Sequence, residues 1–358
     1  MYRMEKARVE WADILKILGI IAVFCGHLGE ETGKLHDFVF YYHVPLFFFA
    51  SGIFAGSSKE LSFKDVVKKR FGQIMLPYIF LTFINMGVII VTSDKNFIIY
   101  LKYIKQFIFG IRNQIPASSL WFFSCIFCTG VLFEILRRLL KKNVLILLTA
   151  AALYFISITL FPNNPSIHPS WIWNVDSACY YLIYYALGYA LHTRLLDLMD
   201  WKQETDKKTV VLLLIGITFL AGYVLSVYLQ EDIIGNILNR AISGFSMIYP
   251  VVRAMLIIFF NLILAKILEG FPLLACAGTQ TLWLCGNEMV VKKILEAAVS
   301  LLGMQIEITG VLPAIIYAAV MAAVIIRVLL PIEKKLYQKY LLKGGKYSLK
   351  ENKFIGKV

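Results

Sequence analysis

The stretch ADILKILGIIAVFCGHL, residues 12–28, decides the fold class, because it is long enough and apolar enough to cross a lipid bilayer. A membrane-spanning helix needs about 20 mostly apolar residues. Similar stretches recur along the 358-residue chain with short breaks, and 59% of the residues are hydrophobic while only 16% are charged. This balance is far from that of a soluble globular domain. The sequence therefore predicts an all-α protein, a polytopic membrane helical bundle of about ten transmembrane helices.

The apolar segments and the basic residues together predict the topology. The candidate spans are residues 12–28, 38–56, 73–93, 120–136, 144–162, 176–192, 209–229, 249–268, 273–291 and 309–330. If the N-terminus lies inside, most of the 36 Lys and Arg residues fall on the cytoplasmic side, as the positive-inside rule requires. We therefore expect a transmembrane domain over residues 1–331, a basic cytoplasmic tail over 332–358, and both termini in the cytoplasm. The net charge of +13 then reflects topology rather than nucleic-acid binding.

Three ionisable residues, Asp13, Lys16 and His27, interrupt the first span. A charge at the bilayer centre costs roughly 2.5–3.5 kcal/mol, so such residues usually face the protein interior or a wet cavity. Lys16 and His27 lie within about 20° of the same helix face, since an α-helix turns about 100° per residue. We interpret them as lining one passage, with Lys16 near its cytoplasmic end. Two plainer interpretations stay open, in which Lys16 extends to the inner headgroups and His27 is a hydrogen-bonded packing residue.

The cysteines favour neither a disulfide framework nor a metal site. All six lie inside apolar segments, which suits buried thiols. Cys125 and Cys128 are one helical turn apart, but a metal site would need two further ligands nearby. We therefore predict no metal.

Several motifs resemble those of the membrane O-acyltransferase family called acyltransferase 3. The run WADILK at residues 11–16, followed by ten residues and then His27, is similar to the first span of that family. The run HVPLFFFASG at residues 43–52 resembles its second span. Further similar runs are KKR at 68–70, LWF at 120–122, DSA at 176–178, LGY at 187–189 and GTQTL at 278–282. The resemblance is dense over the first 120 residues and scattered afterwards.

This resemblance implies a reaction and its partners. The family transfers an acyl group, usually acetyl, from cytoplasmic acyl-CoA to a hydroxyl group of a carbohydrate or cell-envelope glycan. We therefore expect a plasma-membrane enzyme that uses acetyl-CoA as a co-substrate and has no permanently bound cofactor. Its expected partners are acyl-CoA, a carbohydrate acceptor and the lipid bilayer, with no nucleic acid. Glycine-rich helix faces leave a homodimer open as an alternative.

The same reaction assigns expected roles to the polar residues. Histidine suits the general base that a sugar hydroxyl needs near neutral pH, so His27 is the expected base, with Lys16 and Asp13 beside it. A polyanionic CoA needs a basic entrance on the inner side, which Lys68, Lys69 and Arg70 are expected to form. The matched motifs imply substrate-binding residues at His43, Trp121, Asp176 and Asn287.

One position departs from the family pattern. Many members carry a histidine seven residues after the Ser/Thr of the late span, where this chain has Glu288. A glutamate inside a membrane is a functional candidate, and Lys292 or Lys293 is a candidate partner one turn along. We therefore include Glu288 among the catalytic candidates. The alternative is a salt-bridged glutamate at the outer interface.

Two other functions fit part of the sequence. A transporter or flippase of a saccharide intermediate would also place polar residues on one helix face, but such proteins often contain inverted repeats, and we find none. A non-catalytic membrane scaffold would leave Lys16, His27 and Glu288 without a role. The acyltransferase interpretation accounts for all three residues.

Overall fold

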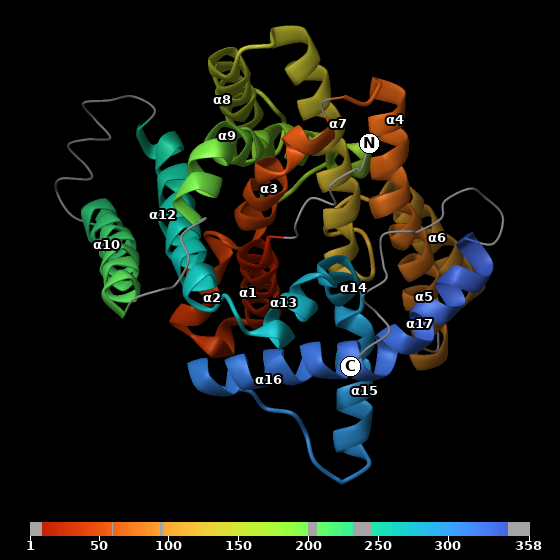
Figure 1. Ribbon diagram of the computed structural model, residues 1–358. Helices are drawn as coiled ribbons and strands as arrows, with labels where there is room; N and C mark the ends of the chain where they lie inside the picture. Colours follow the sequence, from red (N-terminus) through yellow and green to blue (C-terminus); the bar gives the residue numbers. More distant parts are fainter. Residues whose placement is uncertain (1–8, 59, 94–95, 200–205, 232–244, 343–358) are drawn as a thin grey trace, which may run out of the picture.

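The computed structural model describes residues 9–58, 60–93, 96–199, 206–231 and 245–342. All regular structure in these residues is helical, which confirms the predicted helical membrane bundle. The longer helices are α1 (Glu10–Gly26), α2 (Lys34–Phe40), α3 (His43–Ile53), α4 (Phe63–Arg70), α5 (Leu76–Thr92), α6 (Phe97–Phe109), α7 (Trp121–Leu140), α8 (Asn143–Thr159), α9 (Val175–Met199), α10 (Asp206–Glu231), α12 (Phe245–Ile267), α13 (Pro272–Gly278), α14 (Thr281–Gly286), α15 (Glu288–Ser300), α16 (Val311–Val324) and α17 (Leu330–Tyr337). Figure 1 shows their arrangement.

Several helices have the length and composition of membrane spans. In the described residues, four are long and apolar enough to cross a membrane, namely Phe63–Thr92, Ser118–Leu140, Met247–Ile267 and Val311–Leu341, and two shorter apolar helices are Asn143–Thr159 and Val210–Leu225. Large apolar side chains such as Val91, Leu148 and Leu312 are exposed on their surfaces. A soluble protein rarely exposes so much apolar surface, whereas a bilayer covers it. A multi-pass membrane protein is therefore supported, while the count of ten spans is not confirmed.

Helix α1 lies near the centre of the bundle (Figure 1). It contacts α3, α12, α13 and α16, and most of its side chains from Trp11 to Cys25 are buried. The contact with α13 is especially close, because a Cβ atom at Gly278 would lie 1.8 Å from the carbonyl oxygen of Asp13. This central position explains how α1 can carry Asp13 within an apolar sequence, since protein rather than lipid surrounds that carboxylate.

Two predicted spans are broken into shorter helices. The segment 38–56 is divided near Tyr41 and Tyr42, where α2 ends and α3 begins, and the segment 273–291 is divided among α13, α14 and α15. Interrupted helices at membrane depth are tolerated where the irregular backbone is buried in protein or lines a cavity. Here the breaks bring His43 to the start of α3 and Glu288 to the start of α15.

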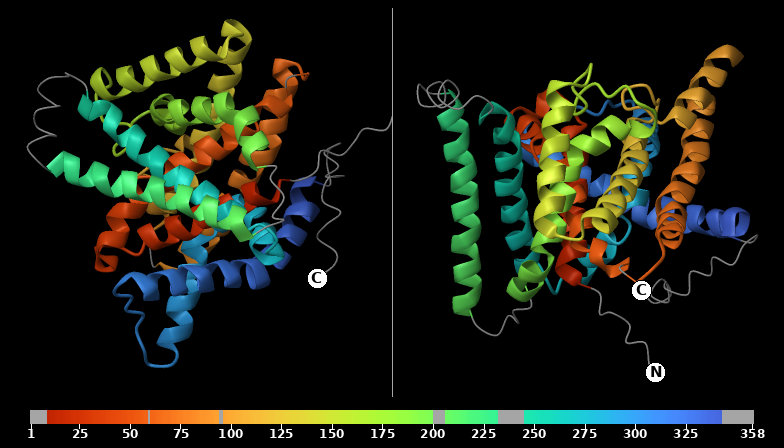
Figure 2. Two further views of the ribbon diagram at one scale, coloured as in Figure 1. Left: turned by 60° about the vertical axis from the view of Figure 1, so that its left-hand side comes forward. Right: turned by 90° about the horizontal axis from the view of Figure 1, so that it is seen from above.

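The other helices surround this centre. Helices α10 and α12 lie side by side (Figure 2), and α3 packs along α9. The segment that starts at Phe97 forms α6, and its Phe97, Leu101 and Ile108 side chains are exposed. The helix that contains α16 and α17 continues to Leu341, past the predicted domain end at 331. The rest of the predicted tail, residues 343–358, lies outside the described residues.

Candidate active site

His27 forms a close pair with Glu288 at the end of α1. The Nδ1 atom of His27 lies 2.8 Å from both carboxylate oxygens of Glu288. Glu288 is the first residue of α15 and is buried. Since a carboxylate oxygen accepts a hydrogen bond, Nδ1 carries the proton and donates it. The Nε2 atom of a neutral His27 then has a free lone pair, which is the state that a general base requires.

Lys292 completes this arrangement. Its Nζ lies 2.7 Å from Oε1 of Glu288 and 3.0 Å from the backbone carbonyl oxygen of His27. An opposite charge at this distance favours the ionised carboxylate, and hydrogen bonds between charged groups are among the strong ones. Of the two lysines predicted as partners, Lys293 instead pairs with Glu296 at the surface. The first turn of α15 therefore fixes both the position and the charge of the carboxylate that holds His27.

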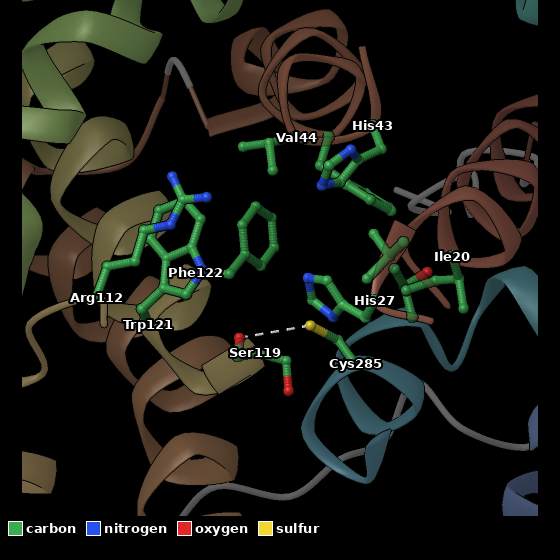
Figure 3. Close-up of a pocket in the computed structure, with 12 residues that line it drawn as sticks. Ile20, His27, His43, Val44, Arg112, Ser119, Trp121, Phe122 and Cys285 are labelled. Atoms are coloured by element: carbon green, nitrogen blue, oxygen red, sulfur yellow. Dashed lines mark hydrogen bonds between the residues drawn. The ribbon is translucent and has the colours of Figure 1, made fainter. Parts of the chain in front are cut away.

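A cavity lies against His27. Its volume is about 30 Å³, and its lining comprises Ile20, Val23, His27, His43, Val44, Phe47, Arg112, Ser119, Trp121, Phe122, Thr281 and Cys285. Figure 3 shows the labelled residues of this lining converging from segments far apart in the sequence. A volume of this size accommodates one or two water molecules or a group of similar size. A ring-sized ligand must therefore reach His27 from the open side of the cavity.

A second imidazole faces the same cavity. His43 is buried, and its Nδ1 donates to the carbonyl oxygen of Val39 over 2.6 Å, since a carbonyl oxygen can only accept. The rings of His43 and His27 are nearly perpendicular, with their centroids 6.4 Å apart. His43 therefore also presents its Nε2 side away from the backbone. The break before α3 sets this position, because Val39 lies in α2 and accepts the hydrogen bond across the break.

The family model described as an acyltransferase domain matches residues 9–331. The chain belongs to the acyltransferase 3 family. No curated protein and no solved structure matches it in the two other comparisons. The match covers α1 to the start of α17, so it includes both partners of the His27–Glu288 pair and all residues that line the cavity. The protein is a membrane acyltransferase, and the resemblance noted in the sequence is confirmed.

In the acyltransferase, Lys16 lies on the same face of α1 as His27. Residues 16, 20, 23 and 27 are separated by four, three and four positions, which places them on one face of the helix. Of these, Ile20, Val23 and His27 line the cavity. Lys16 lies one turn further toward the N-terminus and outside the cavity lining, where its Nζ is 2.6 Å from Asp13 Oδ1. The side chain of Lys16 is one-third exposed and that of Asp13 is buried. Asp13 and Lys16 thus form an ion pair next to the part of α1 that lines the cavity.

The predicted basic entrance has two kinds of residue. Lys68 and Lys69 are exposed in the last turn of α4. Arg70, in contrast, donates from Nη2 to the hydroxyl of Tyr185 over 2.7 Å, and a Cβ atom at Gly130 would lie 2.3 Å from its Nη1. Arg70 of the acyltransferase therefore packs between α7 and α9, whereas Lys68 and Lys69 lie at the surface of α4.

The four predicted substrate-binding residues separate into two pairs. His43 and Trp121 line the cavity. Asp176 accepts hydrogen bonds from the backbone N–H groups of Ser170, Trp171 and Ser177 at the start of α9. Asn287 donates to Glu333 over 2.7 Å. Asp176 and Asn287 lie outside the cavity lining of the acyltransferase, and their contacts are those of residues that hold helix ends together.

Sequence reasoning did not assign four polar or reactive groups at the cavity of the acyltransferase, namely Arg112, Ser119, Thr281 and Cys285. Of these, Thr281 lies in the GTQTL run. Arg112 had a usable signal. It lies in a connection predicted to be on the outer side, where the positive-inside rule expects few cations. Ser119 and Cys285 had no such signal, because a serine at a helix start and a cysteine in an apolar segment are common. In the described part of the chain no cluster of residues suits a metal ion.

Proposed function

We propose that this membrane acyltransferase moves an acetyl group from cytoplasmic acetyl-CoA to a hydroxyl group of a carbohydrate, with His27 as the general base. The observation that carries the proposal is the His27–Glu288 pair at the edge of a cavity. Family membership supplies the acyl transfer. The pair supplies what a hydroxyl acceptor lacks, which is a base that removes its proton near neutral pH.

The proposed reaction balances with the two substrates and His27. The acceptor hydroxyl gives its proton to Nε2 of His27 while its oxygen attacks the carbonyl carbon of the thioester. A tetrahedral intermediate forms, and its C–S bond then breaks to leave an acetyl ester and the CoA thiolate. The protonated imidazole returns the proton to that thiolate, so free CoA leaves as a thiol and His27 is neutral again.

Glu288 and Lys292 support this cycle through charge. When His27 takes the proton it becomes a cation, and the adjacent carboxylate stabilises that cation, as in other His–carboxylate pairs. Lys292 lies 2.7 Å from the carboxylate and offsets its charge while the imidazole is neutral. The three groups sum to zero charge before proton transfer. After it they carry one net positive charge, which the negative oxygen of the tetrahedral intermediate offsets.

The two substrates would approach from opposite sides. CoA carries several negative charges, and the exposed Lys68 and Lys69 of α4 suit its phosphates. In the proposed topology, with both termini in the cytoplasm of a plasma-membrane protein, α4 is on the inner side and the end of α1 is on the outer side. The aromatic rings of Trp121 and Phe122 suit the apolar face of a sugar at the open side of the cavity.

The test is transfer of radiolabelled acetyl from acetyl-CoA by the purified full-length protein in lipid nanodiscs. Glycans extracted from cells that carry the protein serve as acceptors, and the label is followed into ester that mild alkali releases. We expect alkali-labile label in the glycan fraction and one free CoA per acetyl transferred. Absence of both label and free CoA would contradict the proposal.

A further inference from the structure

Arg112 is a cation that lines the same cavity as His27. Its guanidinium carbon lies 4.5 Å from the centroid of the Trp121 ring, and its Nη1 donates to the carbonyl oxygen of Ser166. Figure 3 shows Arg112 beside Trp121, across the cavity from His27. Arg112 is partly buried, so its side chain has exchanged some of its water for these contacts.

The backbone at Arg112 is fixed as firmly as its side chain. The N–H of Arg112 donates to Oδ1 of Asn174 over 2.8 Å. The side-chain amide of Asn174 also donates to the carbonyl oxygens of Gly110 and Trp121, and Asn174 is fully buried. Asn174 has a positive φ of 54°, which asparagine tolerates better than most residues. The connection between α6 and α7 is therefore built to hold Arg112 in one place.

The carboxylates around the cavity already have other partners. Glu288 is bound by His27 and Lys292, Asp176 by three backbone N–H groups, and Asp13 pairs with Lys16. Within the described ranges, no ion pair involves Arg112. Its contacts are with neutral groups, namely the carbonyl oxygen of Ser166, the ring of Trp121 and the hydroxyl of Tyr181, so among the described residues its charge has no neighbouring anion.

A guanidinium in this state suits one class of ligand. Its planar fork forms two parallel hydrogen bonds to a carboxylate or phosphate, and such bonds strengthen as water is excluded. A neutral sugar would make use of Trp121 but would leave the charge of Arg112 uncompensated. The cavity is also too small to enclose a sugar ring, so the acceptor extends past its opening, where groups next to the reacting hydroxyl can reach Arg112.

We infer that Arg112 binds a carboxylate or phosphate group of the acceptor and thereby selects acidic carbohydrates. This inference rests on the proposed function, because it concerns the acceptor of the same transfer. Arg112 is a specificity-determining residue in this scheme, and Trp121 holds both the guanidinium and one face of the sugar. The acidic group anchors the acceptor so that a neighbouring hydroxyl lies over His27.

The experiment extends the nanodisc assay. The extracted glycans are separated by anion exchange into a neutral pool and an acidic pool, and each is incubated with radiolabelled acetyl-CoA. We expect the acidic pool to be labelled at least tenfold faster. Reduction of carboxylates to alcohols with carbodiimide and borohydride, or removal of phosphates with hydrofluoric acid, identifies the anion, because only the treatment that destroys the recognised group removes the preference.

Variants then assign the preference to Arg112. In Arg112→Gln the ratio of acidic to neutral labelling falls by roughly ten- to a hundredfold, the size expected for lost hydrogen bonds to a charged group. Arg112→Lys keeps the charge without the fork and restores part of the ratio. Lys105→Gln, which removes an exposed cation on α6 outside the cavity lining, leaves the ratio unchanged. A variant that only folds poorly lowers both rates and not their ratio.

The possible outcomes separate the two claims. Faster labelling of the neutral pool, or an equal loss of both rates in Arg112→Gln with its folded fraction intact, would overturn the inference while leaving the acetyl transfer in place. The second of these results would assign Arg112 to the reacting carbonyl instead. Absence of label from both pools and absence of free CoA would contradict the proposed function itself, and the inference with it.

Discussion

His27 owes the direction of its ring to a partner 261 positions away in the sequence. Glu288 accepts from Nδ1, and this single contact selects the tautomer in which Nε2 is the free nitrogen. Without the carboxylate, the imidazole can turn about its χ angles or carry its proton on the wrong atom. Glu288 is therefore a positioning residue for the base, and its removal tests geometry and charge together.

We predict that Glu288→Gln lowers kcat for acetyl transfer by roughly a hundredfold or more, the range seen when a general base loses its orienting carboxylate. The KM for acetyl-CoA should change little, because Glu288 does not face the basic entrance. Steady-state kinetics in nanodiscs provide the measurement. Glu296→Gln is the matched control on the same helix, since Glu296 pairs with Lys293 at the surface. Equal kcat values in the two variants would remove Glu288 from the site.

Part of this site was predictable from the residues alone. A histidine and a lysine inside an apolar stretch conflict with the cost of burying charge, and that conflict pointed to His27 and Lys16. The pairing of His27 with Glu288 was not predictable, because periodicity describes one helix and says nothing about which distant helix faces it. The position of Arg112 in a predicted outer connection was visible in the sequence, but its place at the cavity was not. Its role depends on Trp121, Ser166 and Asn174, which come from three different segments.

At the scale of helices, α3 and α9 are interlocked through two glycines. A Cβ atom at Gly52 would lie 2.0 Å from the carbonyl oxygen of Tyr185, and one at Gly188 would lie 2.1 Å from that of Phe49. Each glycine thus accommodates the backbone of the other helix, as small residues do at helix interfaces in membranes. Since α3 begins with His43, this interface also sets the wall of the cavity.

We predict that Gly52→Ala lowers the apparent Tm by several degrees, because overpacking of this kind costs about 1–3 kcal/mol. Loss of the monodisperse peak on size exclusion after heating measures the change. Gly87→Ala is the control inside α5, where a Cβ atom would meet no neighbour within 4 Å, and its Tm should stay the same or rise. A Gly52→Ala protein as stable as Gly87→Ala would contradict the close approach of α3 and α9.

The broken spans were not predictable from the sequence. Apolar composition identifies which segments enter the membrane, so residues 38–56 and 273–291 were each predicted to be one span. Composition does not show where a helix is interrupted. The interruptions near Tyr42 and Asn287 depend on tertiary contacts, such as the hydrogen bond from Asn287 to Glu333, which no local pattern encodes.

For the whole molecule, the proposal separates a basic inner entrance from an outer cavity. We predict that reversing charge at Lys68 and Lys69 raises the KM for acetyl-CoA by roughly tenfold, because each lysine near a phosphate contributes a screened charge interaction. The kcat should be nearly unchanged, and the effect should weaken as salt is raised. Lys142→Glu, an exposed cation before α8, serves as the control. An unchanged KM would remove α4 from the CoA site.

The class of the whole molecule was the most predictable feature. The hydrophobic content and the recurring apolar stretches required a membrane bundle, and the family match over residues 9–331 agrees with it. The number of spans was less accessible, because segments of similar composition fold into long helices, short helices and interrupted helices. Hydrophobicity determines which residues avoid water. Packing determines how they are divided into helices.

The most direct test of the central claim is the rate of acetyl transfer by His27→Ala in nanodiscs. The control is His168→Ala, which removes an exposed histidine outside the cavity, and both proteins are first matched for folded fraction by size exclusion. We predict that His27→Ala loses transfer by at least roughly a hundredfold, while His168→Ala keeps the wild-type rate. Transfer by folded His27→Ala at the wild-type rate would contradict the account.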